Sequence, residues 1–232
     1  MVVAVSTAGG TISLLVGAVL LRLTVTGTYR RYVREEMGLW LAIAGVAVVV
    51  LGLVTVVRAV RRDRLLDAHG HERSGERAGW LLLAPIAALL LVAPPTLGSY
   101  GIGRAAAVDI RAGAPVFRRL PADGPPVTMT LLEFGQRAFE RSGESFNGAS
   151  IRLTGFVAAQ DAEGFRLARY QIACCAADAV PVVIRVVGVH GDLPARDRWV
   201  TVTGRFEPGD GDVPALAAVT VAVVAPPEEP YE

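Results

Sequence analysis

Three long apolar stretches without a charged side chain fill residues 1–103, at 2–21, 39–57 and 79–103. A helix needs about 20 apolar residues to cross a hydrocarbon core of about 30 Å. Each stretch is therefore long enough to span a bilayer. From Arg104 on, the chain has the mixed pattern of a soluble domain. The pattern predicts a transmembrane region with two or three spans, at about 2–21, 39–57 and 79–100, followed by one globular domain outside the lipid.

The third stretch is interrupted by Pro85, Pro94 and Pro95. A proline inside a helix removes a backbone hydrogen bond and clashes with the preceding turn. We therefore predict a helix over residues 79–92 with a break at 93–95. This stretch either spans with a broken end or re-enters the membrane, and re-entry would place the C-terminal domain in the cytoplasm.

Arginines beside the spans indicate the orientation of the chain. The loop after the second stretch holds more of them than the loop after the first, and loops rich in Arg and Lys stay in the cytoplasm. We therefore predict a multi-pass protein of the cell membrane with an extracytoplasmic C-terminal domain. The richer loop contains Arg58, Arg61, Arg62, Arg64, Arg73 and Arg77, and the poorer one contains Arg30, Arg31 and Arg34.

Composition excludes several classes of function. The net charge is only +1, so nothing indicates a nucleic-acid partner. The two cysteines are adjacent and cannot form a disulfide framework. The chain has no Ser-His-Asp spacing, no P-loop and no dinucleotide fingerprint after a predicted strand. We therefore do not expect an enzyme.

The C-terminal domain is predicted over residues 128–232, after a proline-rich linker at 104–127. Thr130 and Glu133 form a capping-box pattern that opens a helix. Apolar residues at 131, 134 and 138 follow the helical period, and Gly143 is a plausible end.

After this helix the apolar period changes to two, which is typical of strands. Five short strands with a regular rhythm of turns favour an OB-like five-stranded barrel with one N-terminal helix. A β-sandwich is the alternative, although it usually has about seven strands. Gly155 and Gly204 lie inside strands and indicate bulges or sharp bends. The predicted strands are 151–157, 164–172, 180–189, 198–206 and 215–224.

Candidate chemistry is concentrated between the second and third of these strands, at Cys174, Cys175 and Asp178. Thiolates bind soft or borderline ions such as Zn²⁺, Cu⁺ and trivalent arsenic, and an aspartate can add an oxygen ligand. A zinc site wants three or four ligands, so His190 or Asp192 in the next turn are further candidates. Neighbouring strand residues point to opposite faces, so both sulfurs can reach one ion only if the chain turns there.

Two alternatives for this segment stay open. The cysteines can be structural, with one packed in the core, because free cysteine is among the most buried residue types. They can also form a redox-active thiol pair. A second polar cluster, His69 and His71 between Asp67 and Glu72, has too few histidines for a specific metal site and is better explained as a solvated loop.

Several features together resemble the bacterial YcgQ-like family of predicted permease subunits, membrane proteins with a C-terminal domain of unknown function. The resemblance covers nearly the whole chain, and the Cys-Cys-Ala-Ala-Asp segment is its most specific part. It rests on the N-terminal apolar stretches, the basic loop with histidine, the Pro94-Pro95 pair, Gly155-Phe156-Val157, the run from Leu167 to Ala179 around Cys174-Cys175, Trp199 to Gly204, and Pro230-Tyr231.

This resemblance implies a non-catalytic accessory subunit of a multi-span permease encoded nearby, in contact with membrane lipid. It also implies that Cys174, Cys175 and Asp178 bind a metal or metalloid ion, zinc or another thiophilic one. The loop with His69 and His71 is often richer in histidine in that family, so this loop is a weaker metal candidate. The alternative is a membrane-anchored module that binds a protein or an envelope polymer, with structural cysteines and no metal.

Overall fold

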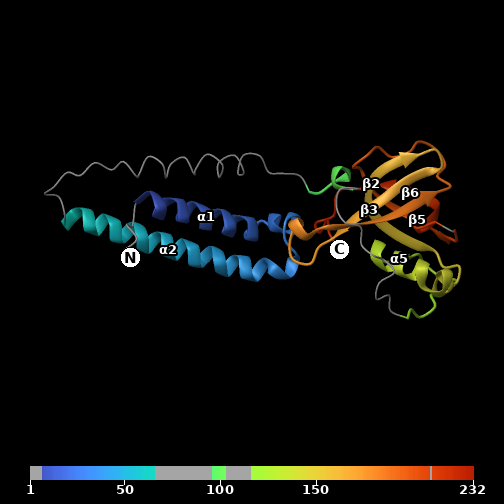
Figure 1. Cartoon of the computed structure of the whole chain (residues 1–232), viewed down its shortest axis with the longest axis horizontal. Helices are drawn as coiled ribbons and strands as arrows, with labels where there is room; N and C mark the ends of the chain where they lie inside the picture. Colours follow the sequence, from blue (N-terminus) through green and yellow to red (C-terminus); the bar gives the residue numbers. More distant parts are fainter. Residues whose placement is uncertain (1–6, 66–95, 103–115, 210) are drawn as a thin grey trace. The chain divides into compact units, whose positions relative to one another are not determined.

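The structure of the chain is a computed structural model that describes residues 7–65, 96–102, 116–209 and 211–232. It contains two compact units, Met1–Pro95 and Thr96–Glu232. Figure 1 shows paired helices in the first unit and a strand-rich domain in the second. Nearly all of the predicted third span, residues 104–115 of the linker, and the pair His69 and His71 lie outside the described residues.

The N-terminal unit is a pair of helices that lie side by side (Figure 1), α1 (Thr7–Val25) and α2 (Gly38–Leu65). The 3₁₀ turns η1 (Thr28–Arg31) and η2 (Glu35–Met37) join them. Glycines let the two backbones approach closely. A Cβ atom on Gly17 of α1 would lie 2.9 Å from the backbone nitrogen of Val49, and one on Gly52 of α2 would lie 2.9 Å from that of Leu14.

One segment of the described residues is long and apolar enough to cross a membrane. It is Glu35–Arg61, with 27 residues, in which a window of 18 residues has a mean hydropathy of 2.7, and it contains the predicted span 39–57. A second apolar helical segment, Gly9–Val25, is shorter. Large apolar side chains of α2, among them Trp40 and Leu51, are exposed, as in a helix that faces lipid. The described residues thus contain one candidate span where the sequence predicts two or three.

The C-terminal unit contains a closed five-stranded β-barrel, as predicted. The strands pair in the order β2–β3–β4–β6–β5, and β5 pairs back with β2 to close the barrel. All these pairs are antiparallel except β4–β6, and a short sixth strand, β1 (Val127–Thr128), adds to β2 in parallel. The barrel strands are β2 (Ile151–Asp161), β3 (Gly164–Gln171), β4 (Val180–Val187), β5 (Trp199–Glu207) and β6 (Ala215–Val223).

Gly155 and Gly204, the two glycines inside predicted strands, differ in how their strands pair with the neighbouring strands. The register between β5 and β6 shifts between Thr203 and Gly204, so the predicted bulge at Gly204 is present. Gly155 lies in regular pairing, and the shift in β2 falls later, between Val157 and Ala159. A Cβ on Gly155 would nevertheless lie 2.7 Å from the carbonyl oxygen of Ala168. Close approach of a neighbouring strand, and not a bulge, therefore explains this glycine.

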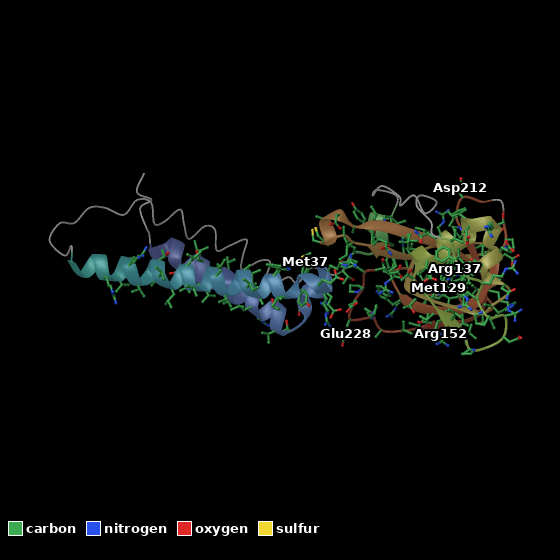
Figure 2. The ribbon with its side chains drawn as sticks, turned by 90° about the horizontal axis from the view of Figure 1, so that it is seen from below. Met37, Met129, Arg137, Arg152, Asp212 and Glu228 are labelled. Carbon is green, nitrogen blue, oxygen red and sulfur yellow. The ribbon has the colours of Figure 1, made fainter. Side chains whose placement is uncertain are left out.

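Helix α5 (Leu131–Phe139) begins where the capping pattern predicts. The Thr130 side chain accepts a hydrogen bond from the backbone N–H of Glu133 at 3.0 Å. Its apolar face joins the main core, with Leu131 and Phe134 fully buried. Arg137, labelled in Figure 2, is buried on the same helix and donates to Glu133 Oε1 at 2.8 Å.

The helix ends earlier than predicted. A 3₁₀ segment, η4 (Glu140–Phe146), follows α5 and contains three successive residues with left-handed backbone angles, Arg141, Ser142 and Gly143. A left-handed residue ends an α-helix, and here two of the three are not glycine. The sequence signal at Gly143 therefore marks the last of these three left-handed residues and not the end of α5.

A second, smaller apolar cluster holds the ends of the unit together. It contains Phe156, Tyr170, Trp199 and Tyr231, with Leu97 and other apolar side chains packed against it. The segment around Leu97 is fixed by Ser99, whose N–H donates to Asp197 Oδ1 at 2.7 Å. Tyr170 also donates its hydroxyl hydrogen to the carbonyl oxygen of Gly98, at 2.9 Å.

Candidate metal centre

The candidate ligands lie in the turn between β3 and β4. The two strands pair antiparallel up to Gln171 and Val180, and the chain between them folds into the short 3₁₀ turn η5 (Ala176–Asp178). Cys174 is exposed and Cys175 is half-buried, and both are free thiols. Because the cysteines stand in a turn and not in a strand, their side chains are not forced onto opposite faces.

Asp178 organises this turn through the backbone. Its Oδ1 accepts a hydrogen bond from the N–H of Ala173 at 2.9 Å, and its Oδ2 accepts from the N–H groups of Cys174 and Cys175 at 2.9 and 3.3 Å. The Cys175 side chain in turn accepts from the backbone N–H of Asp178, which completes a capping box around η5. The aspartate three residues after the pair is therefore a structural cap as well as a candidate ligand.

The same contacts set the protonation of the site. Hydrogen bonds from the Cys174 thiol and then from backbone N–H groups lower the pKa of Asp178 to about 2. The hydrogen bonds of Cys174 to Asp178 and then to Cys175 raise the pKa of the Cys174 thiol to about 11. At neutral pH the turn thus holds a carboxylate beside a protonated thiol. A redox nucleophile requires a thiolate, so this environment does not favour a redox-active thiol.

The three candidate ligand atoms form one compact group. The two sulfurs and a carboxylate oxygen of Asp178 all lie within 4.8 Å of one another, at the surface of the unit. This donor set has two soft ligands and one hard ligand, which suits a thiophilic ion. A bound ion would replace the thiol protons, because a metal-bound cysteine is a thiolate.

The further ligands considered for zinc lie elsewhere. His190 and Asp192 line a separate cavity beside β6 together with Val219 and Val221. The group at Cys174 gains no fourth His, Cys, Asp or Glu ligand from the part of the chain that the structure describes. The turn therefore offers three ligands, one fewer than a structural zinc site.

The raised pKa of Cys174 predicts slow alkylation at neutral pH. With a pKa of about 11, only about one thousandth of this thiol is ionised at pH 8. We expect the rate of its reaction with iodoacetamide, followed by peptide mass spectrometry, to rise steeply between pH 9 and 11. Asp178→Asn removes the negative charge and replaces one of the two acceptor oxygens with a donor, so the rise should move to lower pH.

The control for this experiment is Asp192→Asn, which removes a carboxylate of a different turn. The alkylation profile of Cys174 should not change in this variant. A wild-type profile with its midpoint near pH 8.5, the value for an ordinary cysteine, would show that Asp178 does not hold the thiol proton.

These features define a class of protein: a chain with a helix fit to anchor it in a membrane and a closed β-barrel that presents a Cys-Cys-Asp turn. Residues 136–232 match the model of the DUF1980 C-terminal domain. No curated protein matches the chain.

Proposed function

We propose that this chain is a membrane-anchored, non-catalytic accessory subunit of a permease whose barrel binds one soft metal or metalloid ion through Cys174, Cys175 and Asp178. The observation that carries the proposal is the convergence of three ligand atoms within 4.8 Å in an exposed turn. The exposure of this turn supports the proposal because an ion that is passed to a transporter must be able to enter its site and leave it.

The number and kind of ligands indicate which ions fit best. Trivalent arsenic and Cu⁺ are satisfied by two or three ligands, and both prefer sulfur. Zn²⁺ would need a fourth ligand from water or a partner. We therefore expect arsenite or Cu⁺ to bind this turn more tightly than Zn²⁺ does.

The role as a permease subunit is supported by the apolar segment Glu35–Arg61 and by the resemblance to the YcgQ-like family. The strand order of the closed five-stranded barrel further supports an OB-type module. Folds of this type host many unrelated functions, so the proposed role rests on the Cys174 turn and not on the fold. In this proposal the barrel is extracytoplasmic and holds the ion near the permease. Co-purification with the neighbouring permease would test the partner.

A second candidate function is favoured by the contacts of Asp178. Its carboxylate already accepts three backbone hydrogen bonds, and these stabilise the turn without any ion. In that case the cysteines are structural, and the barrel binds a protein or an envelope polymer through another surface. The two functions differ in whether the turn takes up an ion.

The decisive experiment is a calorimetric titration of the full chain in detergent, under reducing conditions, with arsenite and then with Zn²⁺. We expect about one ion to bind per chain, and the double variant Cys174→Ser/Cys175→Ser to bind none. Asp192→Asn should bind like the wild type because Asp192 lies in a different turn. If the wild type binds neither ion, or if the double variant binds as well as the wild type, the metal proposal is wrong and the second candidate gains support.

A further inference from the structure

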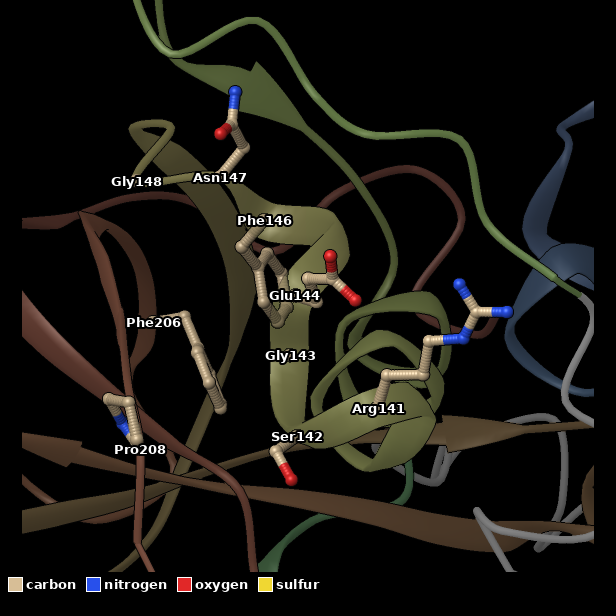
Figure 3. A pocket seen from close by; sticks show the side chains of 9 residues that line it. All are labelled: Arg141, Ser142, Gly143, Glu144, Phe146, Asn147, Gly148, Phe206 and Pro208. Atoms are coloured by element: carbon tan, nitrogen blue, oxygen red, sulfur yellow. The ribbon is translucent and has the colours of Figure 1, made fainter.

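Two adjoining cavities flank the ring of Phe206 near the end of β5. One has a volume of about 390 Å³ and the other about 500 Å³, and both are lined by Ser142, Phe206 and Pro208. Figure 3 shows Phe206 and Pro208 facing Gly143 and Ser142 across the opening. Volumes of 300–1,000 Å³ are typical of sites for small molecules. We call these two cavities together the Phe206 groove.

One wall of the Phe206 groove is the left-handed turn after α5. Arg141 and Ser142 have φ angles of 45° and 55°, which side chains of L-residues rarely adopt. Gly143 follows with φ of 78°, and a Cβ there would lie 2.2 Å from the Phe206 ring. The turn thus brings backbone directly against this ring. Unfavourable backbone angles of this kind are concentrated at binding sites, where the surrounding structure enforces them.

The aromatic ring in the groove is fixed in place. Phe206 stacks on Phe146 with ring centroids 4.7 Å apart and an interplanar angle of 20°. It also meets the edge of Phe134 at 6.1 Å. Phe206 is only partly buried, so it offers a rigid apolar surface to a ligand.

Polar side chains of the groove are free to bind a ligand. Its positive and negative side chains offset one another. The side chains of Ser142 and Glu207 are exposed and form no hydrogen bond or ion pair with any described residue. Arg185 lines the same cavity and forms an ion pair with Glu163. A hydroxyl and a carboxylate therefore stand beside an aromatic ring, without an excess of positive charge.

We propose that the Phe206 groove binds a neutral oligosaccharide. The C–H face of a pyranose ring suits the electron-rich face of an aromatic ring, and sugar hydroxyls can donate to Glu207 and exchange hydrogen bonds with Ser142. Nucleic acid would require several unpaired cations, whereas among the described lining residues Arg141 alone is a cation without an ion pair. In OB-type barrels the loop between the last two strands contributes to oligosaccharide sites, and here the loop between β5 and β6 lines the groove. This site is separate from the Cys174 turn and does not depend on ion binding.

The test uses the full chain in nanodiscs, titrated by calorimetry with cellohexaose, chitohexaose and maltohexaose. We expect saturable binding of at least one of them. Phe206→Leu keeps an apolar side chain but removes the aromatic face, and it should weaken binding about tenfold. Glu207→Gln should weaken it about fivefold. Ser142→Gly removes the hydroxyl and suits the positive φ, so it should reduce affinity without loss of fold.

Controls separate binding from folding. Val219→Thr changes an exposed residue of β6 outside the groove and should leave the affinity unchanged. Hydrogen exchange of the barrel amides should be the same in the wild type and in the Glu207→Gln and Ser142→Gly variants. The proposal is overturned if none of the three hexasaccharides binds or if the groove variants bind like the wild type. It is also overturned if a proline-rich decapeptide binds the groove and the sugars do not.

Discussion

Replacing Gly204 with valine is expected to disrupt the barrel. A Cβ at this position would lie 2.1 Å from the carbonyl oxygen of Ala217 on the neighbouring strand, and backbone cannot move aside as a flexible side chain can. Gly204 also sits at the register shift between β5 and β6, where the barrel bends. Overpacking of this kind costs up to about 3 kcal/mol and occasionally more, and valine adds two further carbons. We therefore expect a loss of at least about 3 kcal/mol in the free energy of unfolding.

Hydrogen exchange of the β5 and β6 amides measures this effect in the full chain. In Gly204→Val these amides should exchange much faster than in the wild type, because exchange follows the free energy of opening. The control is Gly209→Ala, where nothing lies within 4 Å of the added Cβ. Protection in Gly204→Val equal to that in Gly209→Ala would mean that β5 and β6 accommodate the added side chain without loss of stability.

The sequence pattern predicted the barrel strands well. Burial alternates over most of β4 and β5, whereas β3 contains neighbouring buried residues and β6 is mostly half-buried or exposed. β3, β4, β5 and β6 begin and end within two residues of the predicted limits. β2 runs to Asp161, well past the predicted end at Val157. Consecutive residues at 155–158 are all buried, beside the register shift, so the alternation stops while the strand continues.

The irregular backbone after α5 and the long-range aromatic contacts could not be predicted from the sequence. Nothing in the residue types at 141 and 142 indicates left-handed angles, since arginine and serine favour other regions. The Phe206 groove depends on this turn and therefore could not be predicted. The aromatic pair Phe146 and Phe206 joins elements that are 60 residues apart in the chain and are brought together only by the closure of the barrel.

The candidate metal centre was predicted in part. The spacing of Cys174, Cys175 and Asp178 predicts that a turn can bring them together, and the structure shows the three side chains within ligand distance of one another. The spacing did not reveal that Asp178 accepts three backbone hydrogen bonds. An aspartate three residues after a cysteine pair can cap the backbone or bind an ion, and only coordinates distinguish the two. Ion binding itself stays a prediction.

Arg169→Met is expected to release the segment at 229–232 from the barrel. In the wild type the Arg169 guanidinium donates to the carbonyl oxygens of Glu229 and Pro230 at 2.6 and 3.3 Å, and lies 3.5 Å from Glu232 Oε1. The Glu232 side chain is 4% exposed, so loss of Arg169 leaves a buried carboxylate without its cation. Removing one partner of a buried ion pair costs roughly 3 kcal/mol or more. The backbone N–H of Ile172 donates to the Glu232 carbonyl oxygen, and the N–H of Glu232 donates to that of Tyr170, so hydrogen exchange of these two amides should report the loss.

Protonation of Glu232 provides a second test of the same contact. Burial raises the pKa of Glu232, and Arg169 opposes this rise, so the pKa should climb further in Arg169→Met. A carboxyl with a raised folded pKa stabilises the fold when it is protonated, below its unfolded value of about 4.3, and this stabilisation is lost as the pH rises through the folded pKa. The deficit of Arg169→Met relative to the wild type should therefore shrink from pH 7 to pH 4.

The double variant Arg169→Met/Glu232→Gln separates the buried charge from the lost hydrogen bonds. Glutamine is neutral, so the double variant should recover part of the stability at pH 7 and lose the pH dependence of the deficit. Its amide can still accept the hydrogen bonds that Leu131 donates to Glu232 at the start of α5. If the double variant is no more stable than Arg169→Met at pH 7, the carbonyl hydrogen bonds of Arg169, and not its charge, hold this segment on β3.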